Sequence, residues 1–258
     1  MNAALINLFS LKDKIALVTG ANTGIGLAIA EGLAEAGAHI LAANRNREEG
    51  EAAVREMVDK GYQADFYPVD VSEKKSIDDL FAWVEKNYGT LDILVNNAGI
   101  NRMKKIMDFN DDDWEAVMNV DLRGTFYCSK AAFPLMKEKG GKIINLGSIT
   151  AYKCLNNGSS TYSVGKSGVN KLTQVCAVEW APYKTIVNAI APGVCITRIN
   201  KDHYDKHPDL LKRVSAGIPE GRVSVPEDYK GIAVFLASSA SDYMTGQILY
   251  MDGGMSLV

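Results

Sequence analysis

The chain has 258 residues, of which 47% are apolar and 23% charged, so its composition is that of an ordinary globular protein and excludes a disordered chain. Its 28 basic and 31 acidic residues give a net charge of −3 without a basic stripe, which argues against a nucleic-acid partner. No apolar stretch approaches the roughly 18 residues of a membrane span, the N-terminus lacks a signal-type segment, and the four scattered cysteines suit a reducing compartment, so we expect a cytoplasmic protein.

A glycine-rich turn follows the first predicted strand, residues 14–19, and precedes an alanine-rich helix that ends near residue 35. In the order strand, glycine turn and helix, backbone N–H groups and a helix N-terminus are placed to face a pyrophosphate. We therefore predict a dinucleotide cofactor, although the same glycines also suit a tight structural turn. The predicted contacts are Gly20, Asn22, Thr23, Gly24, Ile25 and Gly26.

The second predicted strand, residues 39–43, leads into Asn44 and Arg45. NAD enzymes usually carry a carboxylate at this place, where it binds the ribose hydroxyls and repels a 2′-phosphate. Here a neutral amide precedes a guanidinium that can grip a phosphate in bidentate fashion, so we predict NADP(H) in preference to NAD(H). The alternative is that Arg45 only solvates a loop beside its charged neighbours, which are Arg47, Glu48 and Glu49.

Polar residues also follow the third and fourth predicted strands, residues 64–69 and 91–95. Asp70, with Val71 beside it, is placed either to accept a hydrogen bond from the adenine amino group or to help cap the next helix. Ser72 is the predicted N-cap of that helix, which runs through residue 88. After the fourth strand come small and amide residues that allow close backbone approach to a ribose or a bridge between strands: Asn96, Asn97, Ala98 and Gly99.

A helix predicted from about residue 160 carries Tyr162 and Lys166 four positions apart, so that both side chains project from one face. A free tyrosine is protonated at neutral pH, and an ammonium beside it favours the phenolate. Ser148 follows the fifth predicted strand, residues 142–146, and is placed to hydrogen-bond the same reacting oxygen. The three residues predict a proton-transfer site for a carbonyl or an alcohol, whereas the alternative for the pair is an ordinary helix-surface contact.

A long helix is predicted over residues 114–139, after an acidic run at its N-terminal end. Residues 194–225 follow the sixth predicted strand, residues 186–191, and lack strong periodicity, which predicts a substrate lid. This segment holds His203 and His207, but Pro208 disrupts the helix that a metal-binding pair would need, so we predict no metal site.

Seven predicted strands alternate with six predicted helices, the last of each at residues 248–251 and after Pro226. Regular alternation predicts a single α/β domain of the Rossmann type over residues 1–258, a doubly wound parallel sheet with an N-terminal arm at residues 1–11. Ligands of such sheets bind outside the carboxyl ends of the strands. Residues that follow strands are therefore expected on one rim: Gly20, Asn44, Asp70, Asn97, Ser148 and Pro192.

With these motifs together, the chain resembles the short-chain dehydrogenases/reductases over essentially its whole length. The residues that carry the resemblance are the glycine turn 19–26, the Asn-Asn-Ala-Gly run 96–99, Ser148 with Tyr162 and Lys166, and Pro192-Gly193 followed by Thr197. The resemblance implies that Tyr162 is the acid/base, that Lys166 binds the nicotinamide ribose and favours the ionised tyrosine, and that Ser148 orients the carbonyl. It also implies that Pro192, Gly193 and Thr197 hold the carboxamide and pyrophosphate ends of the cofactor.

One position departs from the family pattern. The family's fourth catalytic residue is an asparagine, and the alignment of residues 120–126 places Asp121 there. Asn119 lies two residues earlier, about 200° around a helix, and cannot replace it. Because this position in the family holds a proton-relay water largely through its main chain, Asp121 is kept as a predicted catalytic residue.

Within the family, the segments 9–19 and 246–254 look similar to gluconate 5-dehydrogenases and related keto-sugar-acid reductases. A basic turn of Arg102, Lys104 and Lys105 suits a sugar carboxylate, or is simply solvated. The expected activity is NADP(H)-dependent interconversion of a secondary alcohol and a ketone on a sugar acid or polyol. Hydroxysteroids and 3-oxoacyl thioesters are alternative substrates, and a non-catalytic cofactor-binding regulator is an alternative of another class. The resemblance further implies a homodimer or homotetramer, for which the apolar helix after Lys166 is the expected interface.

Overall fold

The structure is a computed structural model that describes residues 3–258, with the side chains of residues 198–200 and 203 excepted. In the described part of the chain, seven strands form one parallel sheet in the order β3-β2-β1-β4-β5-β6-β7. The predicted α/β fold of the Rossmann type is therefore confirmed. The strands are β1 (Ile15–Thr19), β2 (His39–Asn44), β3 (Ala64–Pro68), β4 (Ile93–Asn96), β5 (Gly141–Leu146), β6 (Thr185–Pro192) and β7 (Ile248–Met251).

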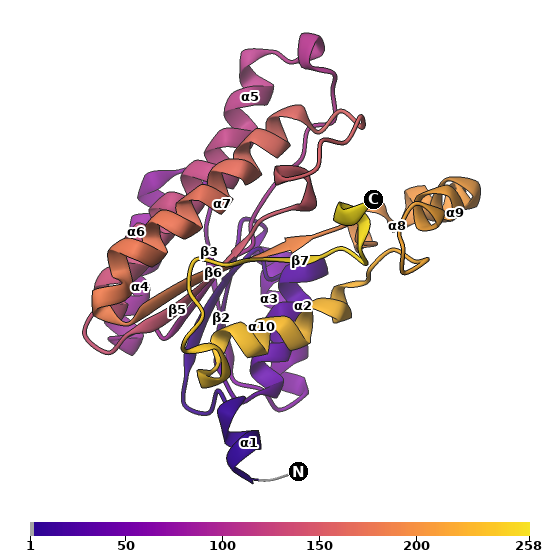
Figure 1. The fold of residues 1–258 in the computed structure, drawn as a ribbon. Helices are drawn as coiled ribbons and strands as arrows, with labels where there is room; N and C mark the ends of the chain where they lie inside the picture. Colours follow the sequence, from indigo (N-terminus) through magenta and orange to yellow (C-terminus); the bar gives the residue numbers. More distant parts are fainter. Residues whose placement is uncertain (1–2) are drawn as a thin grey trace.

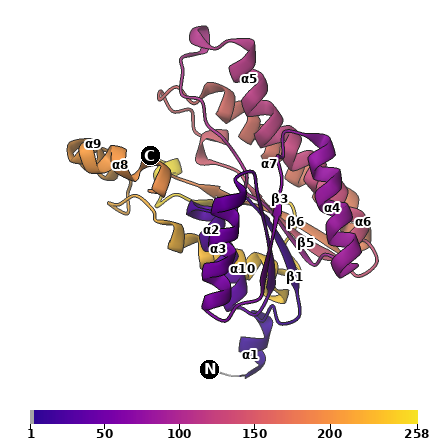
Figure 2. The ribbon, with the colours of Figure 1, turned by 180° about the vertical axis from the view of Figure 1, so that it is seen from behind.

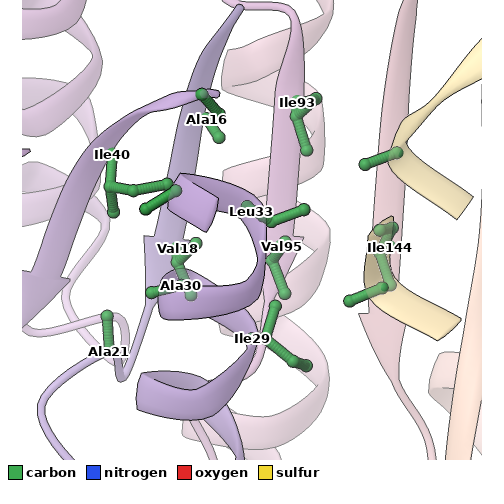
Figure 3. Close-up of a cluster of buried hydrophobic side chains, with 14 of the residues drawn as sticks. Ala16, Val18, Ala21, Ile29, Ala30, Leu33, Ile40, Ile93, Val95 and Ile144 are labelled. Atoms are coloured by element: carbon green, nitrogen blue, oxygen red, sulfur yellow. The ribbon is translucent and has the colours of Figure 1, made fainter. Parts of the chain in front are cut away.

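Helices cover both faces of the sheet, which explains why β1 and β4 are apolar along most of their length. One face carries α2 (Gly24–Glu35), α3 (Arg47–Asp59) and α10 (Lys230–Ala237), and the other carries α4 (Lys74–Tyr88), α6 (Thr125–Met136) and α7 (Ser160–Trp180) (Figures 1 and 2). Figure 3 shows the core on the first face, where Ile29 and Leu33 of α2 lie against Val18 of β1 and Val95 of β4. Burial on both faces fixes the positions at which the loops after the strands begin.

The N-terminal arm contains α1 (Ala3–Leu8), whose residues are all exposed. The arm joins the domain where Ser239 donates a hydrogen bond to the carbonyl oxygen of Leu8 and where Leu11 is buried. The arm therefore packs on the domain chiefly at its C-terminal end.

The long helix predicted over residues 114–139 is wrong in one respect, because it is not a single α-helix. The structure has α5 (Asp111–Val117), a π-helical turn (Met118–Gly124) and then α6. In the wide turn the hydroxyl of Thr125 donates to the carbonyl oxygen of Asp121 at 2.7 Å. Such π-helical turns are frequent at functional sites, and this one contains Asp121.

Two other expectations are corrected by the structure. Residues 194–225 are not an irregular loop, since they contain α8 (Arg198–Lys206) and α9 (Pro208–Ala216). The polar sequence of this segment obscured its helical periodicity. Pro208 does not only follow α8 but is also the first residue of α9. Ser72 does not cap α4, because Glu73 occupies the N-cap position. Ser72 instead donates its N–H and hydroxyl to Asp70 Oδ1, at 2.9 and 2.7 Å.

Candidate active site

A cavity of about 700 Å³ lies at the carboxyl ends of the strands β1, β2 and β4. Its lining contains most of the residues predicted to contact a cofactor. They are Gly20, Asn22, Thr23, Gly24, Ile25, Gly26, Asn44, Arg45, Asp70, Val71, Asn97, Ala98, Gly99 and Thr197. Parallel strands bring these loops to one rim although the loops are far apart in the sequence.

The glycine turn and the loop after β4 are tied together by hydrogen bonds. Asn97 Nδ2 donates to the carbonyl oxygens of Thr19 and Gly20, both at 3.0 Å. The Thr19 hydroxyl accepts from the N–H groups of Asn97 and Ala98, both at 3.1 Å. Gly20 has a φ of +69°, which only glycine adopts readily, and α2 begins at Gly24 without a side-chain cap at Thr23. The start of α2 therefore offers backbone N–H groups to an anion, which fits a cofactor pyrophosphate.

The end of the cavity beyond β2 is lined by polar groups. Arg45 is largely exposed, and its Nη1 lies 3.9 Å from Asp70 Oδ2. Asn44 is buried and donates to the carbonyl oxygen of Asn46 at 2.6 Å, while its Oδ1 has no hydrogen-bond partner among the described residues. Asp70 accepts two hydrogen bonds from Ser72 and so stabilises the loop that follows β3.

Several lining residues were not predicted from the sequence. They are Ala43, Asn46, Glu49, Val69, Ile100 and Val120. Asn22 Nδ2 donates to Glu49 Oε2 at 2.7 Å, which links the glycine turn to the first turn of α3. The sequence held one usable signal, because Asn46 accepts from the N–H of Glu49 as an N-cap and so marks where α3 starts against the cavity.

Tyr162 and Lys166 lie together on α7, as the spacing predicted. Lys166 is buried, and its Nζ is 5.4 Å from the centre of the Tyr162 ring. The ammonium donates to the carbonyl oxygen of Leu146, the last residue of β5, at 2.8 Å. This bond fixes α7 across the end of β5, next to Ser148.

Ser148 is buried at the start of the turn after β5. Its Oγ accepts hydrogen bonds from the N–H and the hydroxyl of Thr150, at 3.1 and 3.0 Å. With both of these bonds received, the proton of the Ser148 hydroxyl remains available for donation to another group. Thr150 was not predicted as a site residue, and no short-range sequence motif marks it.

Asp121 is fully buried and contacts Lys166. Its Oδ1 accepts from the N–H of Ile100 at 2.8 Å, and its Oδ2 lies 3.3 Å from Lys166 Nζ. Burial raises the pKa of Asp121, against the opposing effect of Lys166. Burial also tends to lower the pKa of Lys166, but Asp121 and Tyr162 outweigh it and leave that pKa raised, so the group is an ammonium at neutral pH.

Pro192 and Gly193 lie at the end of β6 but do not line the cavity. A Cβ on Gly193 would come within 2.8 Å of the Asp252 backbone, so close packing explains this glycine. Thr197 does reach the cavity, and its Cγ2 would lie 3.2 Å from a Cβ on Gly24. The segment after β6 thus closes over the glycine turn through Thr197.

The basic turn after β4 lies against the segment that precedes α7, since the N–H of Lys104 donates to the carbonyl oxygen of Gly158 at 2.8 Å. Lys104 forms an ion pair with Asp113, whereas Arg102 and Lys105 are exposed. The side chain of His203 lies outside the described residues. Across the described part of the chain, no three His, Cys, Asp or Glu residues gather as metal ligands, and no helix is long and apolar enough to span a membrane.

Residues 20–256 match the family model described as Enoyl-(Acyl carrier protein) reductase. A 2-dehydro-3-deoxy-D-gluconate 5-dehydrogenase from Dickeya dadantii (strain 3937) is 39% identical over 255 residues, which cover 97% of this chain and 98% of the relative. The 3-oxoacyl-(acyl-carrier-protein) reductase FabG from Chlamydia muridarum is 37% identical over 262 residues, which cover 99% of this chain and 100% of the relative.

The same similarity appears in three dimensions. The solved structure of a gluconate 5-dehydrogenase from Burkholderia cenocepacia J2315, in complex with NADP and tartrate, superimposes with a TM-score of 0.93. The two chains are 36% identical, and the superposition covers 98% of this chain and 99% of that one.

Proposed function

Because this chain belongs to the short-chain dehydrogenase/reductase family of oxidoreductases, we propose that it interconverts a secondary alcohol and a ketone with NADP(H), on a sugar acid or polyol. The observation that carries the proposal is the juxtaposition of Tyr162 and Lys166, which is anchored to the end of β5 beside the cavity that the glycine turn lines. The cofactor, when bound, supplies or accepts a hydride at its nicotinamide.

The proton is handled by side chains of the chain itself. Tyr162 gives its phenolic proton to the forming alkoxide in reduction and takes it back in oxidation. The Lys166 ammonium stabilises the phenolate electrostatically and remains protonated, because Asp121 and Tyr162 support its charge. Ser148 donates its hydroxyl hydrogen bond to the substrate oxygen, because Thr150 already occupies the acceptor sites of the Ser148 oxygen.

The preference for NADP(H) is supported by Arg45 at the wall of the cavity and by the uncharged Asn44 at the end of β2. Glu49 also lines the cavity, but it is engaged by Asn22. The complex of the Burkholderia relative with NADP agrees with this preference.

The substrate class is supported by the relative from Dickeya and by the basic turn, where Arg102 and Lys105 are exposed beside the segment that leads into α7. We propose that residues 194–225, which contain α8 and α9, form the lid over the substrate at the carboxyl ends of the strands. A second candidate, reduction of 3-oxoacyl thioesters, is favoured by the full-length similarity to the FabG protein.

The test is a rate panel with matched variants. Gluconate and other polyols are offered with NADP and NAD, and 5-ketogluconate, a 3-oxoacyl thioester and steroid ketones with the reduced cofactors. Tyr162→Phe should lose about 10²- to 10⁴-fold in turnover while still binding cofactor, and Tyr243→Phe, on a fully exposed residue, should not change. A fully active Tyr162→Phe enzyme contradicts the mechanism, and a wild-type protein that binds cofactor without turnover on any substrate supports the regulator alternative.

A further inference from the structure

We propose that Asp121 is a positioning residue that holds Lys166 in place and partly cancels the positive charge that Lys166 presents to Tyr162. The inference rests on the proposed role of Tyr162 as acid/base. It concerns the position at which this chain has a carboxylate where the family it belongs to has a neutral amide.

The carboxylate of Asp121 is held rigidly. The N–H of Ile100 fixes Oδ1 at 2.8 Å, and the π-helical turn carries the residue into the core, where it has no exposed surface. Oδ2 makes no hydrogen bond within the described residues, although it lies 3.3 Å from the Lys166 ammonium. At this distance the contact between them is chiefly one of charge, and the ammonium also donates a hydrogen bond to the carbonyl oxygen of Leu146.

The packing around the pair leaves little room for rearrangement. A Cβ on Gly99 would lie 3.1 Å from Asp121 Oδ2 and 3.4 Å from Lys166 Nζ, so the backbone of the loop after β4 covers both groups. On the other side, Gly165 of α7 lies against the Cβ of Asp121, with Met118 and Val117 nearby. A side chain at position 99 would therefore press on Asp121 Oδ2, whereas a Cβ on Gly165 would meet the Cβ of Asp121 at an ordinary van der Waals distance of 3.7 Å.

Few charged groups act on this pair. Gly99 and Ile100 after β4 carry no ionisable side chain, and neither do Leu146 at the end of β5 nor Val117 and Met118 beside the π-helical turn. Among the described residues, the groups that act on Lys166 are Asp121 and Tyr162, and the ionisable group that acts on Asp121 is Lys166. The net charge beside Tyr162 therefore depends on whether position 121 is ionised.

A lone ammonium favours the phenolate of Tyr162, whereas an ammonium with a buried carboxylate at 3.3 Å approaches a neutral pair. Replacement of the carboxylate by an amide keeps an acceptor for Ile100 and restores the full effect of Lys166. For a unit charge several ångströms away at the effective dielectric of a protein site, removal of the carboxylate should lower the midpoint of a titration measured at Tyr162 by about one pH unit.

The decisive variant is Asp121→Asn, measured first without cofactor. Ionisation of Tyr162 is followed by near-ultraviolet absorbance as the difference from Tyr162→Phe, in the wild type and in the variant background. Asp112→Asn removes one negative charge from an exposed position on α5 and serves as the control. We expect Asp121→Asn to lower the midpoint by about one pH unit, and Asp112→Asn to leave it unchanged.

The pH profile of alcohol oxidation should move in the same direction and by a similar amount. An unchanged or raised midpoint in a folded Asp121→Asn protein overturns the inference. If that variant does not fold, Asp121→Ser removes the same charge and is read in the same way. Failure of wild-type turnover would count against the proposed function alone, because the absorbance titration needs no substrate.

Discussion

Asn97 Nδ2 lies 3.0 Å from the carbonyl oxygen of Gly20, and this hydrogen bond joins the two loops that form the wall of the cofactor cavity. The same amide also bonds to Thr19, so one side chain fixes the end of β1 relative to the end of β4. The arrangement requires that nothing larger than a hydrogen atom projects from the neighbouring glycines.

Gly26→Ala should therefore impair both cofactor binding and stability. The added Cβ would lie 2.2 Å from both Asn97 Nδ2 and the Gly20 carbonyl oxygen, so the backbone must shift. We expect cofactor affinity to fall at least tenfold and the free energy of unfolding to fall by about 1–3 kcal/mol.

Gly231→Ala is the matched control for this change. Gly231 is also helical, in α10, but a Cβ there meets nothing within 4 Å. It should be neutral or stabilise by about 0.5–1 kcal/mol, as judged by urea unfolding. If both variants behave alike, the tie between Asn97 and Gly20 is not what constrains position 26.

Arg45→Ala should remove the preference for NADP(H). Loss of a charge-assisted contact to the 2′-phosphate is expected to weaken NADPH binding by about tenfold or more and to leave NADH binding nearly unchanged. Fluorescence titration with both cofactors measures this, with Arg47→Ala as control because Arg47 pairs with Glu51 on α3. Equal weakening of NADPH binding in the two variants would favour the view that Arg45 only solvates its loop.

Asp228 stabilises the fold in a pH-dependent way. Its hydrogen bond with Arg222 at 2.7 Å lowers the pKa of Asp228, and Oδ2 also accepts from the N–H of Val225 at 2.9 Å. Because the folded-state pKa lies below the unfolded value of about 3.9, this stabilisation is present above that pH and is lost as the pH falls through the folded-state pKa.

Asp228→Asn should therefore reduce the free energy of unfolding at neutral pH by about 1 kcal/mol or less, since the pair is partly exposed. The difference between variant and wild type should shrink as the pH falls through this range. Urea titrations at neutral and acidic pH measure it, and a difference that grows in acid would contradict the assignment.

We propose that α7 contributes to an interface between copies of the chain. Val178 is 77% exposed on its outer face, and other apolar side chains are exposed on α6 and α7, namely Phe126, Val164 and Val175. Val178→Glu should convert a dimer or tetramer to a smaller species in light scattering. Val58→Glu, at a half-exposed valine of α3, should not. A wild-type monomer would rule out the interface.

The placement of many predicted site residues could be anticipated from the sequence because the signals for them are local. Tyr162 and Lys166 lie within one helical turn, and the glycine turn is bounded by a strand and a helix that each have a strong pattern. The helices in residues 198–216 and the π-helical turn were missed, because their side-chain patterns are weak and their geometry depends on the elements around them.

The sequence by itself determined the order of strands and helices, the resemblance to the family and the rim on which the polar residues gather, since parallel strands with short-range crossovers allow few other arrangements. Only the tertiary structure decided that Asp121 faces Lys166, that Thr150 occupies the acceptor sites of Ser148, and that Asn97 rather than Asn96 ties β1 to β4 at the cavity. The pairings of Asp121 with Lys166 and of Asn97 with Gly20 join side chains that are distant in the chain. The first distance depends on how α7 packs against the π-helical turn and the second on how β1 pairs with β4, and no periodicity in the sequence records either.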